Sequence, residues 1–490
     1  MRESSKNTPK APSSRVSKLT SEESAPKTRS AKAPTGTSKP SKTAPASTGK
    51  TPKSTKPAAE TAATPEPKRS RPAASNSETA RRPAAEAPAL KAETRKAGNI
   101  KTASPPSKAA PQGRTILCVT RVRAGRTFME EAARMGCRVL VLTERAALSE
   151  HFPDCVETIV TVPSLLDGNA VADVVARLHR ETPIDRVVPM LEGQVELAAR
   201  IRRLLGVPGQ GVEQARLFRD KLAMRLTALG ADIAVPYFAP ALDRERVVAM
   251  LESVAPPYML KLRDGFGSRN MQRIDSRSQL MQAIASLGTR KDDYLAEQYI
   301  PGDVYHVDSV VEGGKVKFSL ASRYGLPLYD VLQGGNFVTY TVARGSELEA
   351  KLLAINERVI QAFGLQRGVT HIEFIRSSET GELYFLEAAN RIPSARIPMV
   401  INEAAGVCLY RELAKLEAHD KYQAPKPVEG HAGFITTVPK RGPVKLDGFK
   451  EKEIVWRSQD PYQPGLIIRS DDAKRVEKLL KDYDKRFATF

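Results

Sequence analysis

The stretch HIEFIRSSETGELYFLEAANRIPSAR (residues 371–396) is the most informative part of this sequence. Two short apolar runs, 371–375 and 383–387, flank a polar turn that contains a glycine, and this pattern predicts a β-hairpin. Each run carries one acid, Glu373 or Glu387. A hairpin centred on the turn sets the two acids directly opposite each other on one face of the sheet, roughly 5 Å apart.

Two opposed carboxylates repel each other, so some other group must offset their charge. A divalent cation would do so, because Mg²⁺ prefers a few carboxylate oxygens together with water and nucleotide phosphates. Asn390 follows Glu387 closely and can add a neutral oxygen, while Arg391 and Arg396 supply fixed positive charge for a phosphate or carboxylate. A solvated hairpin whose acids face water is the alternative interpretation of this stretch alone.

The pattern H-x-E, then a turn, then Glu-x-x-Asn-Arg resembles the metal-binding end of ATP-grasp enzymes. The resemblance implies that Glu373, Glu387 and Asn390 hold Mg²⁺ or Mn²⁺ on the phosphates of ATP. It also implies that Arg391 contacts the transferred phosphate or the substrate. One departure is that residues 392–395, Ile-Pro-Ser-Ala, stand where the family often has Gly-rich residues.

The first 113 residues differ in composition from the rest of the 490-residue chain. They hold 23 Lys and Arg against 8 Glu, which gives +15 of the net charge of +20, and they contain no Phe, Trp or Tyr. Such a segment cannot bury enough apolar surface to offset the cost of ordering it, so a disordered basic tail is predicted. It could contact polyanions through charge alone, whereas the lack of aromatic residues disfavours recognition of specific bases. A plain solvated tail is the alternative that we favour.

The four cysteines are not spaced as metal ligands, and we expect reduced thiols in a cytoplasmic protein. No apolar run reaches the roughly 18 residues needed to span a bilayer. The N-terminus also lacks the apolar segment of a secretory signal.

Residues 114–212 alternate apolar runs with helical segments. The runs TILCVT, RVLVLTE, ETIVTVP and DRVVPM are rich in Val, Leu and Ile, as expected of strands buried in a parallel, doubly wound sheet. The loop RVRAGRTF lacks the G-x-G-x-x-G pattern, so a dinucleotide site there is only weakly indicated. In ATP-grasp proteins this position holds a Rossmann-like domain that precedes the ATP-binding module, and the sequence is similar in that respect.

Residues 213–425 carry three further stretches that resemble parts of the ATP-grasp module. A helix predicted over 219–229 has Lys221 near its start, and the resemblance implies that this lysine reaches the nucleotide phosphates. The strand YMLKL places Lys261 in an apolar run, where a cation needs either a protein carboxylate or a phosphate as partner; we favour phosphate. The Gly-containing turn that follows can close over phosphates with its backbone N–H groups, and the resemblance extends this role to Ser268.

The stretch EQYIPGD follows a further predicted strand. A segment of this kind can present its backbone to the adenine edge while its apolar side chains pack on the ring. The resemblance implies adenine contacts for Glu297, Gln298 and Ile300. It implies a ribose contact for Asp303, the acid nearest to the family's usual position. His306 lies on the next strand, and we interpret it as a buried histidine with satisfied polar groups.

The resemblance therefore implies a protein with α/β and α+β parts. A Rossmann-like domain over 114–212 is followed by a split ATP-grasp module over 213–425 and a small β-rich C-terminal subdomain over 426–490. The implied activity is that of an ADP-forming ligase, which activates a carboxylate as an acyl phosphate for attack by an amine or thiol. Lys261 and Arg391 are the expected catalytic residues.

Two alternatives stay open at this point. One is an ATP-grasp carboxylase that uses bicarbonate as its carboxylate. The other is an inactive nucleotide-binding scaffold targeted by its basic tail. The sequence identifies neither the acid nor the nucleophile, which we expect to be small molecules, and it leaves a homodimer open.

Overall fold

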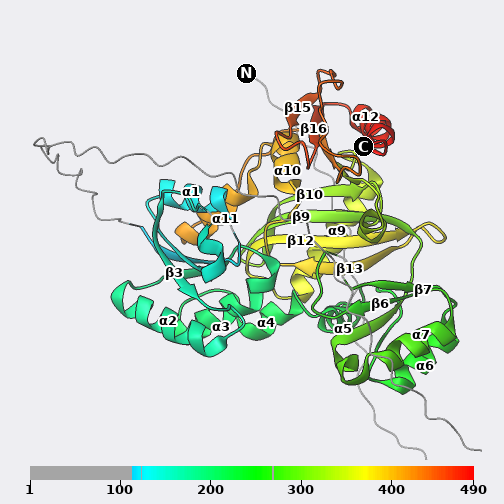
Figure 1. Cartoon of the computed structure of the whole chain (residues 1–490), viewed down its shortest axis with the longest axis horizontal. Coiled ribbons are helices and arrows are strands. Elements are labelled where there is room, and N and C mark those ends of the chain that lie inside the picture. The colour runs from blue at the N-terminus through cyan, green and yellow to red at the C-terminus, as the bar shows by residue number, and fades with distance from the viewer. Residues whose placement is uncertain (1–112, 123, 150, 268–269) are drawn as a thin grey trace, which may run out of the picture. The chain divides into compact units, whose positions relative to one another are not determined.

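The computed structural model describes residues 113–490 except 123, 150 and 268–269. The predicted tail lies outside the described residues apart from its last residue, and so does Ser268. The described part of the chain forms three β-sheets with helices packed on them (Figure 1). No helix in this part is both long enough and apolar enough to cross a bilayer.

The first sheet has four parallel strands in the order β3-β2-β1-β4. Its strands and helices are β1 (Thr115–Val119), α1 (Arg126–Arg134), β2 (Arg138–Glu144), β3 (Val156–Val162), α2 (Gly168–Glu181), β4 (Arg186–Pro189) and α3 (Val195–Leu205). Side chains of a strand alternate between the two faces of its sheet. Ile116 and Cys118 accordingly pack with α1, whereas Leu117 and Val119 pack with α2 and α3. Helices cover both faces, so the predicted doubly wound sheet is confirmed.

The second sheet has four antiparallel strands in the order β5-β8-β6-β7. The elements of this region are α4 (Val212–Leu217), α5 (Lys221–Gly230), β5 (Phe238–Pro240), α6 (Arg244–Ser253), β6 (Tyr258–Leu262), β7 (Gln272–Ile274), α7 (Arg277–Ser286) and β8 (Tyr294–Gln298). Helices α6 and α7 share one apolar core with this sheet. The predicted helix begins at residue 219, but α5 begins at Lys221. The reason is that Asp220 is its N-cap and accepts a hydrogen bond from the backbone N–H of Leu222. Lys221 is therefore the first residue of the helix.

The third sheet has eight antiparallel strands in the order β13-β12-β9-β10-β11-β14-β16-β15. Its first elements are β9 (Gly302–Glu312), β10 (Lys315–Tyr324), α8 (Leu328–Leu332), β11 (Phe337–Thr341), α9 (Glu347–Ala362), β12 (Arg367–Ser377), β13 (Leu383–Ala389), α10 (Ile397–Ala405) and α11 (Leu409–Ala418). Helices α5 and α9 pack on one face through a core that includes Phe374 and Phe385. Helices α10 and α11 share a second core with Val310 and Leu320.

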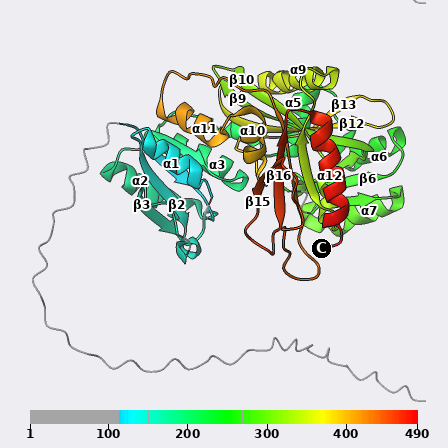
Figure 2. The same ribbon diagram turned by 90° about the horizontal axis from the view of Figure 1, so that it is seen from above.

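The C-terminal residues add the strands at the other end of this sheet. They form β14 (His431–Thr436), β15 (Ile454–Arg457), β16 (Gly465–Ser470) and α12 (Ala473–Phe487). The β-rich character predicted for 426–490 is confirmed, but these strands have no sheet of their own, because β14 pairs with β11 of the preceding region. Helix α12 lies beside β16, as Figure 2 shows, and packs on it through Leu479 and Leu480.

Candidate active site

The two hairpin acids stand opposite each other. Glu373 of β12 and Glu387 of β13 are register partners, so the predicted pairing is confirmed. Their side chains are partly buried, with 14% and 23% of their surface exposed. The register shifts directly after Glu373, where a β-bulge precedes Phe374. The two carboxylates therefore lie on one face at the point where the ladder is interrupted.

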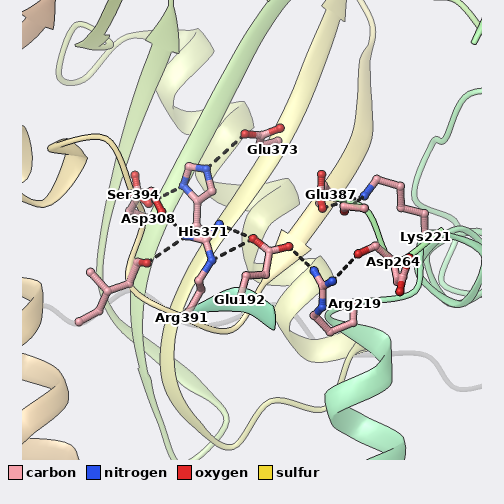
Figure 3. A network of polar contacts seen from close by, with 12 residues as sticks. Glu192, Arg219, Lys221, Asp264, Asp308, His371, Glu373, Glu387, Arg391 and Ser394 are labelled. Carbon is pink, nitrogen blue, oxygen red and sulfur yellow. Dashed lines mark hydrogen bonds and ion pairs between the residues drawn. The ribbon is translucent and has the colours of Figure 1, made fainter. Parts of the chain in front are cut away.

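Protein groups already offset part of the repulsion between these acids (Figure 3). The Nζ atom of Lys221 lies 2.9 Å from Glu387 Oε1 and also donates a hydrogen bond to the backbone oxygen of Gly265, at 2.7 Å. The hydroxyl of Tyr324 donates to Glu373 Oε1 at 3.0 Å, and His371 Nε2 lies 3.2 Å from the same oxygen. The predicted need for groups that offset the charge of the acids is thus met in part by the protein itself.

A buried chain of polar groups continues from Glu373 into the sheet. His371 Nδ1 lies 2.7 Å from Asp308 Oδ1, and His306 Nδ1 lies 2.7 Å from Asp308 Oδ2. At the far end, His306 Nε2 lies 2.8 Å from the hydroxyl of Thr339. His306 is thus a buried histidine with satisfied polar groups, as predicted. The three residues could also gather around a metal ion, but each nitrogen and oxygen that would bind it already has a hydrogen-bond partner.

The charges in this chain are stabilised by one another. Burial alone would raise the pKa of Asp308, but the neighbouring His306 and His371 outweigh burial and lower it to about 2. Burial would lower the pKa of His371, yet the carboxylates of Asp308 and Glu373 raise it to about 9. Despite burial, hydrogen bonds from His371 and Tyr324 hold the pKa of Glu373 below its ordinary value. Glu373 is therefore an ionised carboxylate with a fixed orientation.

Lys261 has a protein carboxylate as its partner. Its Nζ atom lies 2.6 Å from Glu297 Oε2, and Arg225 Nε lies 2.7 Å from the other oxygen of the same carboxylate. Neither Glu297 nor Arg225 exposes any of its side chain. Despite burial, the two cations lower the pKa of Glu297 to about 2. In this structure Lys261 therefore pairs with a carboxylate, and its contact with a phosphate stays a prediction.

The residues predicted to bind adenine and ribose are only partly available. The side chain of Glu297 is occupied by its ion pairs, so only its backbone could meet an adenine ring. The backbone N–H of Gln298 donates to Tyr237 O at 2.8 Å, and Ile300 is buried. Asp303 forms an ion pair of 2.6 Å with Arg323. The roles of these residues in nucleotide binding stay predictions, and Ser268 lies outside the described residues.

Arg391 meets a carboxylate that the sequence interpretation did not identify. Its Nε atom donates to Glu192 Oε2 at 2.9 Å, and Arg219 pairs with the other oxygen of Glu192 (Figure 3). Glu192 follows β4 of the first sheet and is buried. Although burial acts in the opposite direction, the two arginines lower the pKa of Glu192. The backbone oxygen of Asp264, in the Gly-containing turn, accepts a further hydrogen bond from Arg219.

Asn390 does not join the hairpin acids. An offset of three residues along an extended strand turns a side chain to the opposite face. The amide nitrogen of Asn390 accordingly donates to Gln210 Oε1 at 3.0 Å, and its oxygen lies against Gly368. Arg396 is also placed elsewhere, with its guanidinium 4.4 Å from the centre of the Trp456 ring. A metal-binding role for Asn390 stays a prediction that this arrangement does not support.

A cavity of about 1130 Å³ adjoins this network. Its wall includes Glu192, Arg219 and Arg391 on the polar side. Apolar side chains from the first sheet's helices and loops line another part, among them Leu166, which is 87% exposed, and Leu197. A pocket that joins a few convergent charges to an apolar wall is typical of a small-molecule site.

Comparisons with known proteins agree with this architecture. A family model described as the ATP-grasp N-terminal domain matches residues 129–209. An L-arginine-specific L-amino acid ligase of Bacillus subtilis is 25% identical over 334 residues, which cover 64% of this chain and 79% of the relative. Residues 129–209 thus match an ATP-grasp N-terminal domain, and the chain is similar to a ligase over 334 residues.

Other ATP-grasp proteins match over shorter stretches or by structure. A D-alanine–D-alanine ligase of Alkalilimnicola ehrlichii is 27% identical over 235 residues, covering 46% of this chain and 75% of the ligase. The crystal structure of an L-amino acid ligase from Bacillus licheniformis superposes with a TM-score of 0.61 at 20% identity. That match covers 76% of this chain and 97% of the ligase. At this identity the structural likeness shows the fold alone.

Proposed function

We propose that this ATP-grasp protein is an ADP-forming ligase that activates a carboxylate as an acyl phosphate and joins it to an amine. The observation that carries the proposal is that three clusters of charged groups lie close together (Figure 3). Lys221 pairs with Glu387, which stands opposite Glu373, and Arg391 pairs with Glu192 on the wall of a large cavity. Phosphoryl transfer depends mainly on positioning and on charge stabilisation, and this set of residues offers both.

The hairpin acids fit a divalent cation. Two carboxyl groups on one face supply the hard oxygen ligands that Mg²⁺ and Mn²⁺ prefer. Tyr324 and His371 already orient the oxygen of Glu373, as partners of a metal-binding carboxylate commonly do. Glu373 and Glu387 would hold the ion, which when bound neutralises charge on the phosphates of ATP.

The remaining residues have complementary tasks. Lys221 and Lys261 would contact the phosphates, and Arg391 would stabilise charge on the transferred group. In the first step a carboxylate oxygen of the substrate attacks the terminal phosphorus, and the bond from that phosphorus to the ADP oxygen breaks. In the second step the amine nitrogen attacks the acyl carbon, phosphate leaves, and the nitrogen loses a proton. No covalent bond to the protein is needed.

Amino acids are the substrate class that the relatives favour. The Bacillus subtilis relative is named for L-arginine and L-amino acids, and the Alkalilimnicola relative for D-alanine. We extend this class to the present chain as an amino acid carboxylate joined to the amine of a second amino acid. A thiol nucleophile and the carboxylase alternative lack comparable support, since the matching structure of a biotin carboxylase from Campylobacter jejuni is 15% identical.

The partners and compartment follow from the same proposal. The substrates are small molecules, and the basic segment 1–113 would add only a charge-dependent contact to polyanions. All four cysteines are unpaired, which fits a reducing cytoplasm.

The test supplies the purified chain with Mg-ATP and pooled L-amino acids, and measures phosphate release together with the mass of any product. We expect release that depends on the amino acids, with a dipeptide mass in the same sample. Bicarbonate in place of the pool tests the carboxylase. Phosphate release with bicarbonate alone would overturn the proposal. So would a protein that binds Mg-ATP but releases no phosphate with amino acids or other carboxylic acids. Glu387→Gln serves as the inactive control.

A further inference from the structure

A second cavity, of about 340 Å³, lies beside the C-terminal end of helix α11. Its wall combines residues of β4, α3, the start of β12 and α11. The charged side chains that line it are Arg186, Arg202, Arg367, Arg391 and Glu417. We call this space the arginine cavity. Arg391 is already paired with Glu192, which leaves three guanidinium groups facing one carboxylate.

The hydrogen bonds of these arginines do not cancel their charge. Arg202 donates to the backbone oxygen of Val187 at 2.9 and 2.6 Å and to that of Gln210 at 3.2 Å. Arg367 donates to the backbone oxygen of Leu416, in the last turn of α11, at 2.9 Å and to that of His419, directly after the helix, at 2.6 Å. Arg186 comes no closer than 3.7 Å to the carboxylate of Glu417.

Neighbouring negative groups offset part of this positive charge. The C-terminal end of a helix carries partial negative charge, and Arg367 lies there together with Arg114. Asp420 pairs with Arg114 and lies 3.9 Å from Arg186, but its side chain is 85% exposed and water screens its charge. Burial, together with the nearby Arg114 and Arg367, lowers the pKa of Arg186. Arg186 and Arg202 thus line the cavity, and the negative charge around them does not balance their positive charge.

A buried hydrogen-bond donor also lines the arginine cavity. Gln210 is 9% exposed, and its amide oxygen accepts from Asn390 at 3.0 Å. Its amide nitrogen has no hydrogen-bond partner among the residues that the structure describes. A buried polar group without a partner costs stability, so such groups are rare in folded proteins and call for an acceptor.

We propose that the arginine cavity binds a small molecule that carries a phosphate or carboxylate group, held by Arg186, Arg202 and the amide nitrogen of Gln210. The volume suits a small ligand rather than a nucleotide. Arg391 and Asn390 lie on the wall of this cavity, but Arg391 is paired with Glu192 and Asn390 with Gln210. Lys221, Lys261 and both hairpin acids do not line the cavity, so the site goes beyond the proposed function. The ligand's oxygens would complete the ion pairs of the arginines.

The test measures the thermal stabilisation of the full chain by inorganic phosphate and, separately, by malonate. The two arms distinguish a phosphate ligand from a carboxylate ligand. We expect Arg186→Gln to weaken the binding of the better anion by about tenfold, as loss of a charge-assisted hydrogen bond does. Gln366→Glu, which adds an acid to the exposed rim of the cavity, should weaken it as well.

Two controls locate the binding site. Arg180→Gln removes an exposed arginine of α2 that does not line the arginine cavity, and it should bind like wild type. Lys221→Met tests whether the anion instead occupies the site proposed for ATP, and stabilisation should persist in it. Stabilisation that survives Arg186→Gln, stabilisation lost in Lys221→Met, or no response of the wild type to either anion would each overturn the proposal.

Discussion

Replacing Lys261 by methionine separates a structural ion pair from a contact with phosphate. Glu297 is completely buried and has two cationic partners, Lys261 at 2.6 Å and Arg225 at 2.7 Å. Removing the only partner of a buried charge lowers the free energy of unfolding by about 3–5 kcal/mol. Arg225 remains in Lys261→Met, so the expected loss of unfolding free energy is smaller. It corresponds to one hydrogen bond between charged groups, about 1.5–3 kcal/mol.

The assay is urea unfolding of the nucleotide-free protein, in a cycle of Lys261→Met, Glu297→Gln and the double variant. The two changes should not add, because both remove the same interaction, and the coupling energy should be about 1.5–3 kcal/mol. Lys315→Met, an exposed lysine on β10, is the matched control and should leave stability within about 0.5 kcal/mol. A Lys261→Met protein as stable as this control would refute the reasoning.

The same proteins test the contact with ATP in a second arm. At a nucleotide concentration of about 100 times the dissociation constant, Mg-ATP should stabilise the wild type by roughly 2.7 kcal/mol. If Lys261 leaves Glu297 for a phosphate, Lys261→Met should lose much of this response as well. An unchanged response would mean that Lys261 serves the fold alone.

Three further predictions follow from the site. Glu387→Gln should abolish Mg²⁺-dependent phosphate release and lower the apo stability by about 1 kcal/mol, because Lys221 loses its carboxylate partner; an unchanged Mg²⁺ requirement would contradict the metal assignment. The pKa values of Glu297 and Asp308 are lowered to about 2, so the stability they supply should be complete above their ordinary pKa values and decline in acid unfolding curves as the pH falls toward 2. Asp308→Asn should loosen His371 and raise the Mg²⁺ concentration for half-maximal activity about tenfold. Thr339→Val, at the far end of the same chain of polar groups, should raise this concentration less. Equal effects of the two variants would argue against a positioning role for Asp308.

The elements and the hairpin register could be predicted because both follow from local rules. Continuous apolar runs gave the parallel strands of the first sheet. The constant sum of paired residue numbers in a hairpin placed Glu373 against Glu387. The bulge after Glu373 could not be predicted, because no glycine or proline marks it in the sequence. The N-cap role of Asp220 could have been inferred from the sequence, because Asp is a preferred N-cap residue, and it moves the start of α5 by two residues.

The partners of the charged residues could not be predicted, because they come from distant segments. Arg391 and Glu192 are 199 positions apart, and Lys221 and Glu387 are 166 positions apart. No periodicity relates such pairs. Asn390 is different, since the alternation of side chains along a strand already indicates that a residue three positions after Glu387 faces the other way.

These partners share a pattern that bears on how the site could work. Each cation assigned to ATP is paired with a protein carboxylate: Lys221 with Glu387, Lys261 with Glu297, and Arg391 with Glu192. A partly buried cation without a counter-charge would be costly, so the free protein needs these acids. Each acid also keeps an interaction if its cation turns to a phosphate. Glu297 retains Arg225, Glu192 retains Arg219, and Glu387 would face the metal. Binding of Mg-ATP would then exchange one set of ion pairs for another, which keeps charges compensated in both states.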